Sequence, residues 1–162
     1  MSATAWSVRN VRDLEWWQDR PRGFVAELVP RDGAQVGVNL FVLAPGDPMS
    51  MYHWEGDQEG FLVLSGEALL IVEDEERPLR PWDYFHCPGG VAHTIIGAGD
   101  GPTAVLAVGA RSGDDSGAYP YSEVAMRHNA SAEAETAETK VAYARFPAEA
   151  RAEFSEEWLA GE

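Results

Sequence analysis

Short apolar segments separated by turn residues fill the middle of this chain, and their spacing constrains the fold more than any other feature. The segments are rich in Val, Leu, Ile and Phe, and no helical period appears between residues 36 and 108. Glycine, proline and acidic residues stand between them and favour turns. The pattern predicts an antiparallel β-sandwich or barrel with strands at 36–43, 49–55, 61–65, 68–72, 84–87, 93–96 and 103–108.

The size and charge of the chain exclude several kinds of partner. Its 162 residues suffice for one domain with a buried core. The net charge of -15 repels phosphate backbones and anionic lipid surfaces, so we expect no nucleic acid and no membrane partner. No apolar stretch approaches the roughly 18 residues that suggest a membrane-spanning helix.

The amino-terminal sequence and the cysteine content favour the cytoplasm. Residues 1–7 lack the basic and apolar blocks of a signal peptide. Cys87 is the single cysteine, so no internal disulfide can form. We therefore expect a cytoplasmic protein in a reducing compartment.

Changes in composition divide the chain into three parts. Residues 1–35 are expected to supply strands that join the barrel, residues 36–111 its core, and residues 112–162 an extension. Pro147 stands near the start of a segment with one apolar face, which predicts a short amphipathic C-terminal helix. This helix would either cover the outside of the barrel or form a dimer contact, through Ala150, Phe154, Trp158 and Leu159.

Histidine and glutamate residues occur within and beside the predicted strands. Alternate side chains of a strand share a face, so His53 and Glu55 should point the same way, and a turn after them could bring Glu59 back across. His93 would arrive on a neighbouring strand. Such nitrogen and oxygen ligands suit Fe(II), Mn(II), Ni(II), Cu(II) or Zn(II). The alternative is a polar cluster that only hydrogen-bonds inside the barrel, although burying these groups without a metal is costly.

These residues lie in two motifs that resemble the conserved motifs of the cupin superfamily. Gly46, His53, Glu59 and Gly66 match the first motif, and Pro88, Gly90 and His93 match the second. The resemblance implies an all-β, double-stranded β-helix, or jelly roll, with a metal in its lumen. It also implies that the protein is a homodimer.

Three positions depart from the family motifs. Glu55 occupies the place of the family's second histidine, Trp82 that of a glycine and Gly97 that of an asparagine. A glutamate keeps an oxygen ligand but adds negative charge, which favours a harder divalent ion. Gln58 could serve as a neutral ligand instead. We expect one divalent transition metal, Fe, Mn, Zn or Ni, bound by His53, Glu55, Glu59 and His93.

Other candidate residues have weaker sequence support. His86 and Cys87 are neighbours on a strand, so only one of them faces the lumen; His86 is expected in the barrel wall or an interface and Cys87 in the core. His128 lies in the polar extension. Arg111, at the end of the last predicted strand, fits either a surface role or the binding of an anionic substrate.

Two hypotheses about function follow from the resemblance. The superfamily includes dioxygenases, isomerases, decarboxylases and ligand sensors, and a fold alone does not fix the chemistry. We expect a dioxygenase or isomerase that acts on a chelating small molecule, such as an enol, a catechol or a keto acid, in the lumen. The alternative is a noncatalytic, metal-dependent sensor or binding module, because the sequence offers no separate catalytic base or nucleophile.

Overall fold

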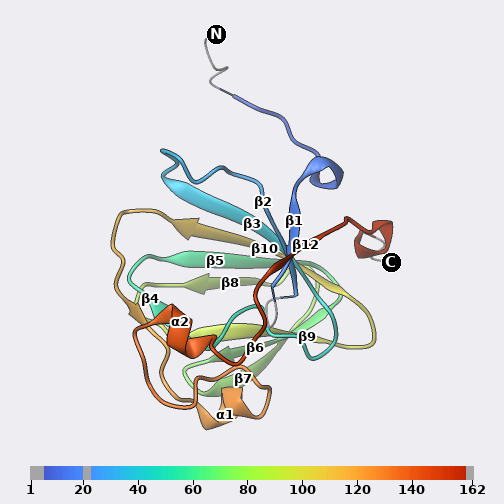
Figure 1. Cartoon of the computed structure of the whole chain (residues 1–162). Helices are drawn as coiled ribbons and strands as arrows, with labels where there is room; N and C mark the ends of the chain where they lie inside the picture. Colours follow the sequence, from blue (N-terminus) through green and yellow to red (C-terminus); the bar gives the residue numbers. More distant parts are fainter. Residues whose placement is uncertain (1–5, 20–22, 160–162) are drawn as a thin grey trace.

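The computed structural model describes residues 6–19 and 23–159, and most of its strands belong to two facing antiparallel sheets, beside a small sheet of two strands (Figure 1). Residues 1–5, on which part of the signal-peptide argument rests, lie outside the described residues. The larger sheet contains, in spatial order, β12 (Ala150–Ala152), β1 (Trp16–Gln18), β2 (Phe24–Glu27), β3 (Val36–Leu43), β10 (Thr103–Ala110), β5 (Glu59–Ser65) and β8 (Tyr84–Cys87). The smaller sheet contains β7 (Glu75–Leu79), β6 (Glu67–Val72) and β9 (His93–Ala98). The predicted all-β jelly-roll architecture is confirmed.

The strand predictions fail at two places. Residues 49–55 were expected to form one strand, but only β4 (Trp54–Glu55) is a strand there, paired with β11 (Gly117–Ala118). The preceding residues instead make isolated bridges to β9, one of which joins His53 to His93. The four acidic residues at 73–76 were expected to form only a turn. The turn contains Glu73 and Asp74, and β7 begins at Glu75.

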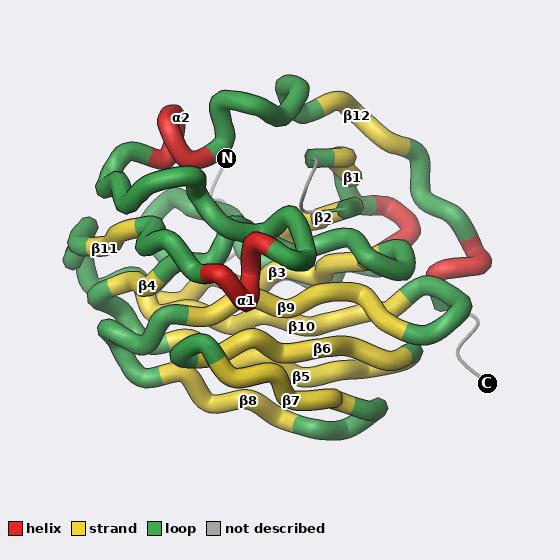
Figure 2. Tube along the Cα trace, turned by 90° about the horizontal axis from the view of Figure 1, so that it is seen from below, coloured by secondary structure: helices red, strands yellow, loops and turns green. Residues whose placement is uncertain are grey.

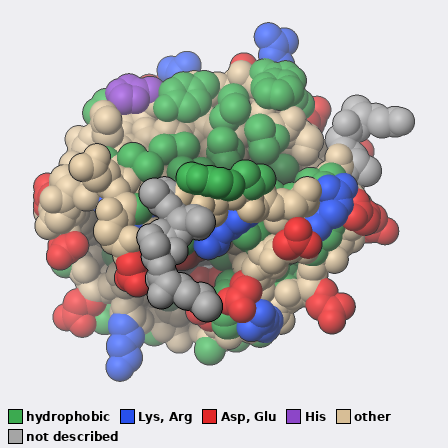
Figure 3. Space-filling model, turned by 90° about the horizontal axis from the view of Figure 1, so that it is seen from above, with side chains coloured by type: hydrophobic (Ala, Val, Ile, Leu, Met, Phe, Trp, Pro, Cys, Tyr) green, Lys and Arg blue, Asp and Glu red, His purple; other side chains and the backbone are tan. Residues whose placement is uncertain are grey.

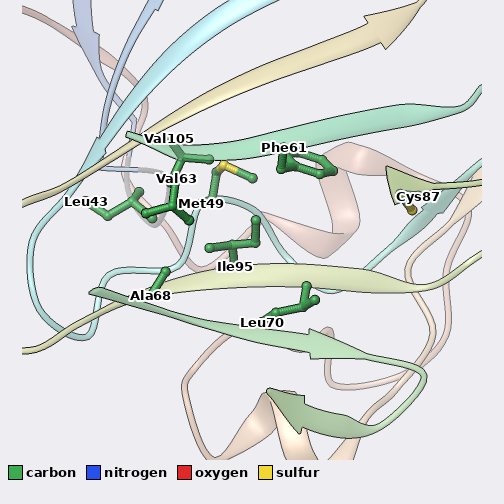
Figure 4. Packing of buried hydrophobic residues seen from close by; sticks show 9 residues of the cluster. All are labelled: Leu43, Met49, Phe61, Val63, Ala68, Leu70, Cys87, Ile95 and Val105. Carbon is green, nitrogen blue, oxygen red and sulfur yellow. The ribbon is translucent and has the colours of Figure 1, made fainter. Parts of the chain in front are cut away.

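Apolar side chains from both sheets meet in the core. Leu43, Val63 and Val105 point inward from the larger sheet, while Leu70 and Ile95 come from the smaller one (Figure 4). Strand alternation produces this arrangement, because every second residue of β5 faces the lumen. The core therefore holds the two sheets together and leaves polar residues to one end of β5 and β9.

The C-terminal extension contains short helices, and the segment where one was predicted is helical only at its end. The described helices are η1 (Val11–Asp13), α1 (Glu123–Met126), α2 (Thr139–Ala142) and η2 (Glu156–Trp158). The helix expected after Pro147 is reduced to the single turn η2, because residues 150–152 form β12 on the edge of β1 instead (Figure 2). Apolar residues at 150, 152 and 154 also fit the two-residue period of a strand, and the edge of β1 supplies its hydrogen-bonding partners.

The residues after β12 cover the outside of the larger sheet. Phe154 and Trp158 pack on Trp16, with ring centroids 6.0 and 4.9 Å away, and Trp158 also lies 4.5 Å from the Phe24 ring. The segment thus covers the outside of the barrel, as one of the two sequence interpretations held. None of the helices in the described part of the chain has the length and apolar character needed to cross a membrane.

We expect Ile95→Ala to lower the free energy of unfolding by about 2–5 kcal/mol, because Ile95 is completely buried and truncation leaves a cavity. Urea denaturation followed by circular dichroism measures this change. Val141→Ala is the control, since the Val141 side chain is more than half exposed and its loss should change stability by at most about 0.5 kcal/mol. Equal losses in both variants would contradict the described core.

Candidate metal centre

Backbone hydrogen bonds bring the two histidines of the sequence motifs together. The amide of His53 donates to the carbonyl of His93 at 3.2 Å, and the amide of His93 donates to the carbonyl of His53 at 2.8 Å. Their ring centroids lie 5.0 Å apart. The sequence predicted this meeting of two distant segments, and the backbone bridge provides the physical reason for it.

Glu59 approaches the two imidazoles from the opposite sheet. It is the first residue of β5, and its side chain shares the inner face with Phe61 and Val63. One carboxylate oxygen lies 3.2 Å from Nε2 of His93. One ligand atom from each of His53, Glu59 and His93 falls within 4.8 Å of the other two. Three of the four expected ligands therefore converge.

Glu55 lies at the rim of this group. Its Oε1 is 3.3 Å from Nε2 of His53, so the two side chains do point the same way, but half of the Glu55 side chain is exposed. Hydrogen bonding with His53 lowers the pKa of Glu55, which keeps the carboxylate ionised. Glu55 is not part of the group within 4.8 Å. Gln58 is not among the residues that line the adjoining hollow.

The ring orientations of both histidines suit metal binding. Nδ1 of His53 lies 2.8 Å from the carbonyl of Met51, and Nδ1 of His93 lies 3.0 Å from that of Val91. A carbonyl can only accept, so each Nδ1 carries the proton and each Nε2 is the available ligand atom. Nε2 of His93 is buried and makes no well-formed hydrogen bond with any described residue. A divalent transition metal would satisfy this atom, so the residues present fit such an ion.

The environment of His93 favours its protonation when no metal competes. Burial works against the charged imidazole, whereas Cys87 Sγ, 3.3 Å from Nδ1, and the Glu59 carboxylate favour it. The balance raises the pKa of His93 to about 10. A metal bound at Nε2 must therefore displace a proton.

The histidines and Glu59 open onto a hollow of about 440 Å³ with both polar and aromatic walls. Tyr119 and Tyr143, from the C-terminal extension, form part of this wall. The Tyr119 ring lies 5.7 Å from that of His53, held there by the pairing of β11 with β4. Sequence reasoning missed both tyrosines, because they lie far from the motifs and only the fold brings them close.

Comparison with known proteins agrees with this geometry. The family model described as "Cupin domain" matches residues 39–109, which include all three converging residues. Residues 39–109 form a cupin domain. No curated protein sequence matches the chain.

Solved structures share the fold of this cupin-domain protein. A sugar phosphate isomerase from a cupin superfamily, from Silicibacter pomeroyi, is 30% identical with a TM-score of 0.54, over 62% of this chain and 65% of the isomerase. The chain thus spans less than two thirds of that protein. A Cupin 2 conserved barrel domain protein from Salinispora arenicola is 21% identical with a TM-score of 0.56, over 77% of this chain and 97% of that one. The polyketide cyclase RemF from Streptomyces resistomycificus is 20% identical with a TM-score of 0.56, over 65% and 80%.

The remaining candidates occupy different parts of the cupin-domain protein. Cys87 is buried in the core and His86 is exposed on β8. His128 lies 2.7 Å from the Glu76 carboxylate at the surface, and its proximity lowers the pKa of Glu76. Arg111 lines the hollow beside the converging residues. Of these four, only Arg111 is placed to contact a molecule in the hollow.

We expect Ni(II) binding at pH 8 to release about one proton per protein molecule. An ordinary imidazole is already neutral at this pH, but the raised pKa of His93 keeps its proton in place until the metal displaces it. Isothermal titration calorimetry in buffers with different ionisation enthalpies counts the released protons. Heats that do not depend on the buffer would contradict a protonated His93.

Proposed function

We propose that this cupin-domain protein binds one divalent transition metal through His53, Glu59 and His93 and acts as a metalloenzyme on a small chelating molecule. The observation that carries the proposal is the buried Nε2 of His93, which has no well-formed hydrogen bond and faces a histidine and a carboxylate. Two imidazoles and one carboxylate suit Fe, Mn, Zn or Ni. Glu55 is the proposed fourth ligand, at the rim.

A reaction of the isomerase or dioxygenase type is compatible with this arrangement. When bound, the metal would supply a Lewis acid or an oxygen-binding centre with open positions for the substrate. The protein would supply orientation and exclude water, because Phe61 and Phe85 pack 5.2 and 5.7 Å from the His93 ring. The 30% identity to the sugar phosphate isomerase supports the isomerase type in particular.

We expect His93→Ala to abolish metal retention while the protein stays folded. The variant removes a central ligand from the proposed site but leaves the apolar core intact. Inductively coupled plasma mass spectrometry of the purified protein measures the metal content, and circular dichroism checks the fold. His86→Ala is the matched control, because His86 lies exposed on β8. Unchanged metal content in folded His93→Ala would defeat the assignment.

Turnover assays on the same proteins separate the enzyme from a binding module. The metal-loaded wild type is incubated with enolic, phenolic and phosphorylated sugar compounds, and oxygen consumption and NMR spectra are followed. Conversion that His93→Ala loses and His86→Ala keeps supports the enzyme. Tight ligand binding without conversion would instead indicate a metal-dependent sensor or binding module.

We further propose that two copies of the chain pair through the outer face of the larger sheet. Val36, Tyr84 and Val108 point outward from this face and are exposed. None of the outward residues of β3, β10, β5 and β8 is acidic, although the chain carries 27 acids. Figure 3 shows hydrophobic side chains gathered in the upper part of the view, with acidic ones mostly at the sides and in the lower half. A face without acids lets two chains of net charge -15 approach each other.

We expect Val108→Glu to shift the protein from dimer to monomer, because a carboxylate buried between two copies would be left without a partner. Size-exclusion chromatography with light scattering measures the mass. Val141→Glu, a change at an exposed position on α2, should leave the dimer intact. A monomeric wild type, or a dimer that Val108→Glu leaves unchanged, would contradict this interface.

A further inference from the structure

A row of glycines leaves the inner face of the larger sheet bare beside Glu59. Gly37 of β3 pairs with Gly109 of β10, and Gly109 pairs with Glu59 of β5, so the three residues lie in one line across the strands. A Cβ added at Gly109 would meet nothing closer than the Cγ of Glu59, at 3.8 Å. The row therefore forms an open trough that begins at the proposed metal ligand.

The far end of this trough carries a positive charge. Arg111 follows directly after β10, and a Cβ added at Gly37 would lie 3.0 Å from its Nη2 and 3.1 Å from its Nε. The guanidinium thus lies over the bare backbone of Gly37. Nη1 donates a hydrogen bond to the carbonyl of Pro30 at 3.0 Å. None of the ion pairs found among the described residues involves Arg111, which leaves its charge available to a ligand.

The second arginine of the hollow is already paired. Arg31 lies 2.7 Å from the Glu27 carboxylate, and more than three quarters of its side chain is exposed. Apart from the two histidines of the proposed metal site, the other ionisable groups that line the hollow include Glu55, Glu59 and Arg111. Glu59 faces the histidines and Glu55 lies beside His53, so the guanidinium of Arg111 is the positive group that faces the open trough.

An unsatisfied polar atom lies beside the trough. Asn39, the residue of β3 that pairs with Ala107, lines the same hollow, and its Oδ1 is buried without a hydrogen-bond partner among the described residues. A buried amide oxygen without a partner costs free energy, and a ligand hydroxyl would satisfy it. A molecule that spans the trough would therefore lie beside a hydrogen-bond acceptor, Oδ1 of Asn39.

We infer that the substrate is an anion: a chelating small molecule that carries a carboxylate or phosphate bound by Arg111. The inference rests on the proposed metal function and adds the substrate class. Strands β3 and β5 are two inter-strand spacings apart, so about 10 Å separate the backbone below Arg111 from that of Glu59. The chelating group and the anionic group of the substrate are accordingly held at the two ends of the trough, with a hydroxyl of the substrate donating to Asn39.

Two hydroxamic acids of equal length test this inference without knowledge of the natural substrate. Adipic monohydroxamic acid carries a terminal carboxylate, whereas hexanohydroxamic acid carries a methyl group in its place. Calorimetric titration of the full-length, Ni(II)-loaded protein should show about tenfold or greater preference for the carboxylate compound, as a charge-assisted hydrogen bond provides. Arg111→Gln should remove this preference and leave the affinity for hexanohydroxamic acid unchanged.

Two further variants separate substrate binding from a structural role of Arg111. Arg77→Gln removes an exposed arginine that pairs with Glu75 on β7, away from the hollow, and should keep the preference. Gly109→Val places a side chain in the trough and should weaken both long hydroxamates while acetohydroxamic acid, a short one, binds as before. A role of Arg111 only in holding Pro30 would change the melting temperature of Arg111→Gln and leave the ratio of the two affinities intact.

The outcomes distinguish this inference from the proposed function. Equal affinity of the wild type for the two long hydroxamates would overturn the anionic substrate and leave the metal site standing. Failure of all three hydroxamates to bind the Ni(II)-loaded wild type would overturn the open metal site and the inference with it. A preference that survives in Arg111→Gln would assign the anionic group to another residue and refute the role of Arg111.

Discussion

The paired backbone hydrogen bonds between His53 and His93 hold the candidate metal centre together. They join the irregular segment before β4 to the first residue of β9, and the two imidazoles meet because their backbones are bridged. The packing of the larger sheet on the smaller one then places the Glu59 carboxylate beside the two imidazoles. Disruption of the bridge would separate the two imidazoles of the proposed site even with every side chain present.

The centre lies where the apolar core gives way to polar groups. Phe61 is almost fully buried, and its ring stacks on Phe85 at 5.8 Å and lies 5.2 Å from His93. The cost of burying the imidazoles is offset at Nδ1, where backbone carbonyls accept their protons. Nε2 of His93 is buried 3.2 Å from the Glu59 carboxylate without a well-formed hydrogen bond, and this geometry is the physical reason to infer a metal. The same end of the barrel opens into the trough that leads to Arg111.

The sequence predicted most of the barrel because alternation and turn residues are local signals. The segments at 36–43 and 84–87 form strands with the predicted ends, and the side chains of His53, Glu59 and His93 converge. The segment after Pro147 misled because its apolar residues fit both a helix and a strand, and only the open edge of β1 decided between them. The tyrosines of the extension and the Gly37–Gly109 row depend on pairing between distant segments, which no local pattern reveals.

Anomalous diffraction from crystals of the metal-loaded protein, recorded at the absorption edge of the bound metal, examines the centre itself. We expect one ion about 2.0–2.2 Å from Nε2 of His53, Nε2 of His93 and an oxygen of Glu59. Its distance from Glu55 would decide whether that residue completes the ligand set. Saturating metal without a peak at this position, or with the ion held only by surface acids such as Asp114 and Asp115, would contradict the proposed metal centre.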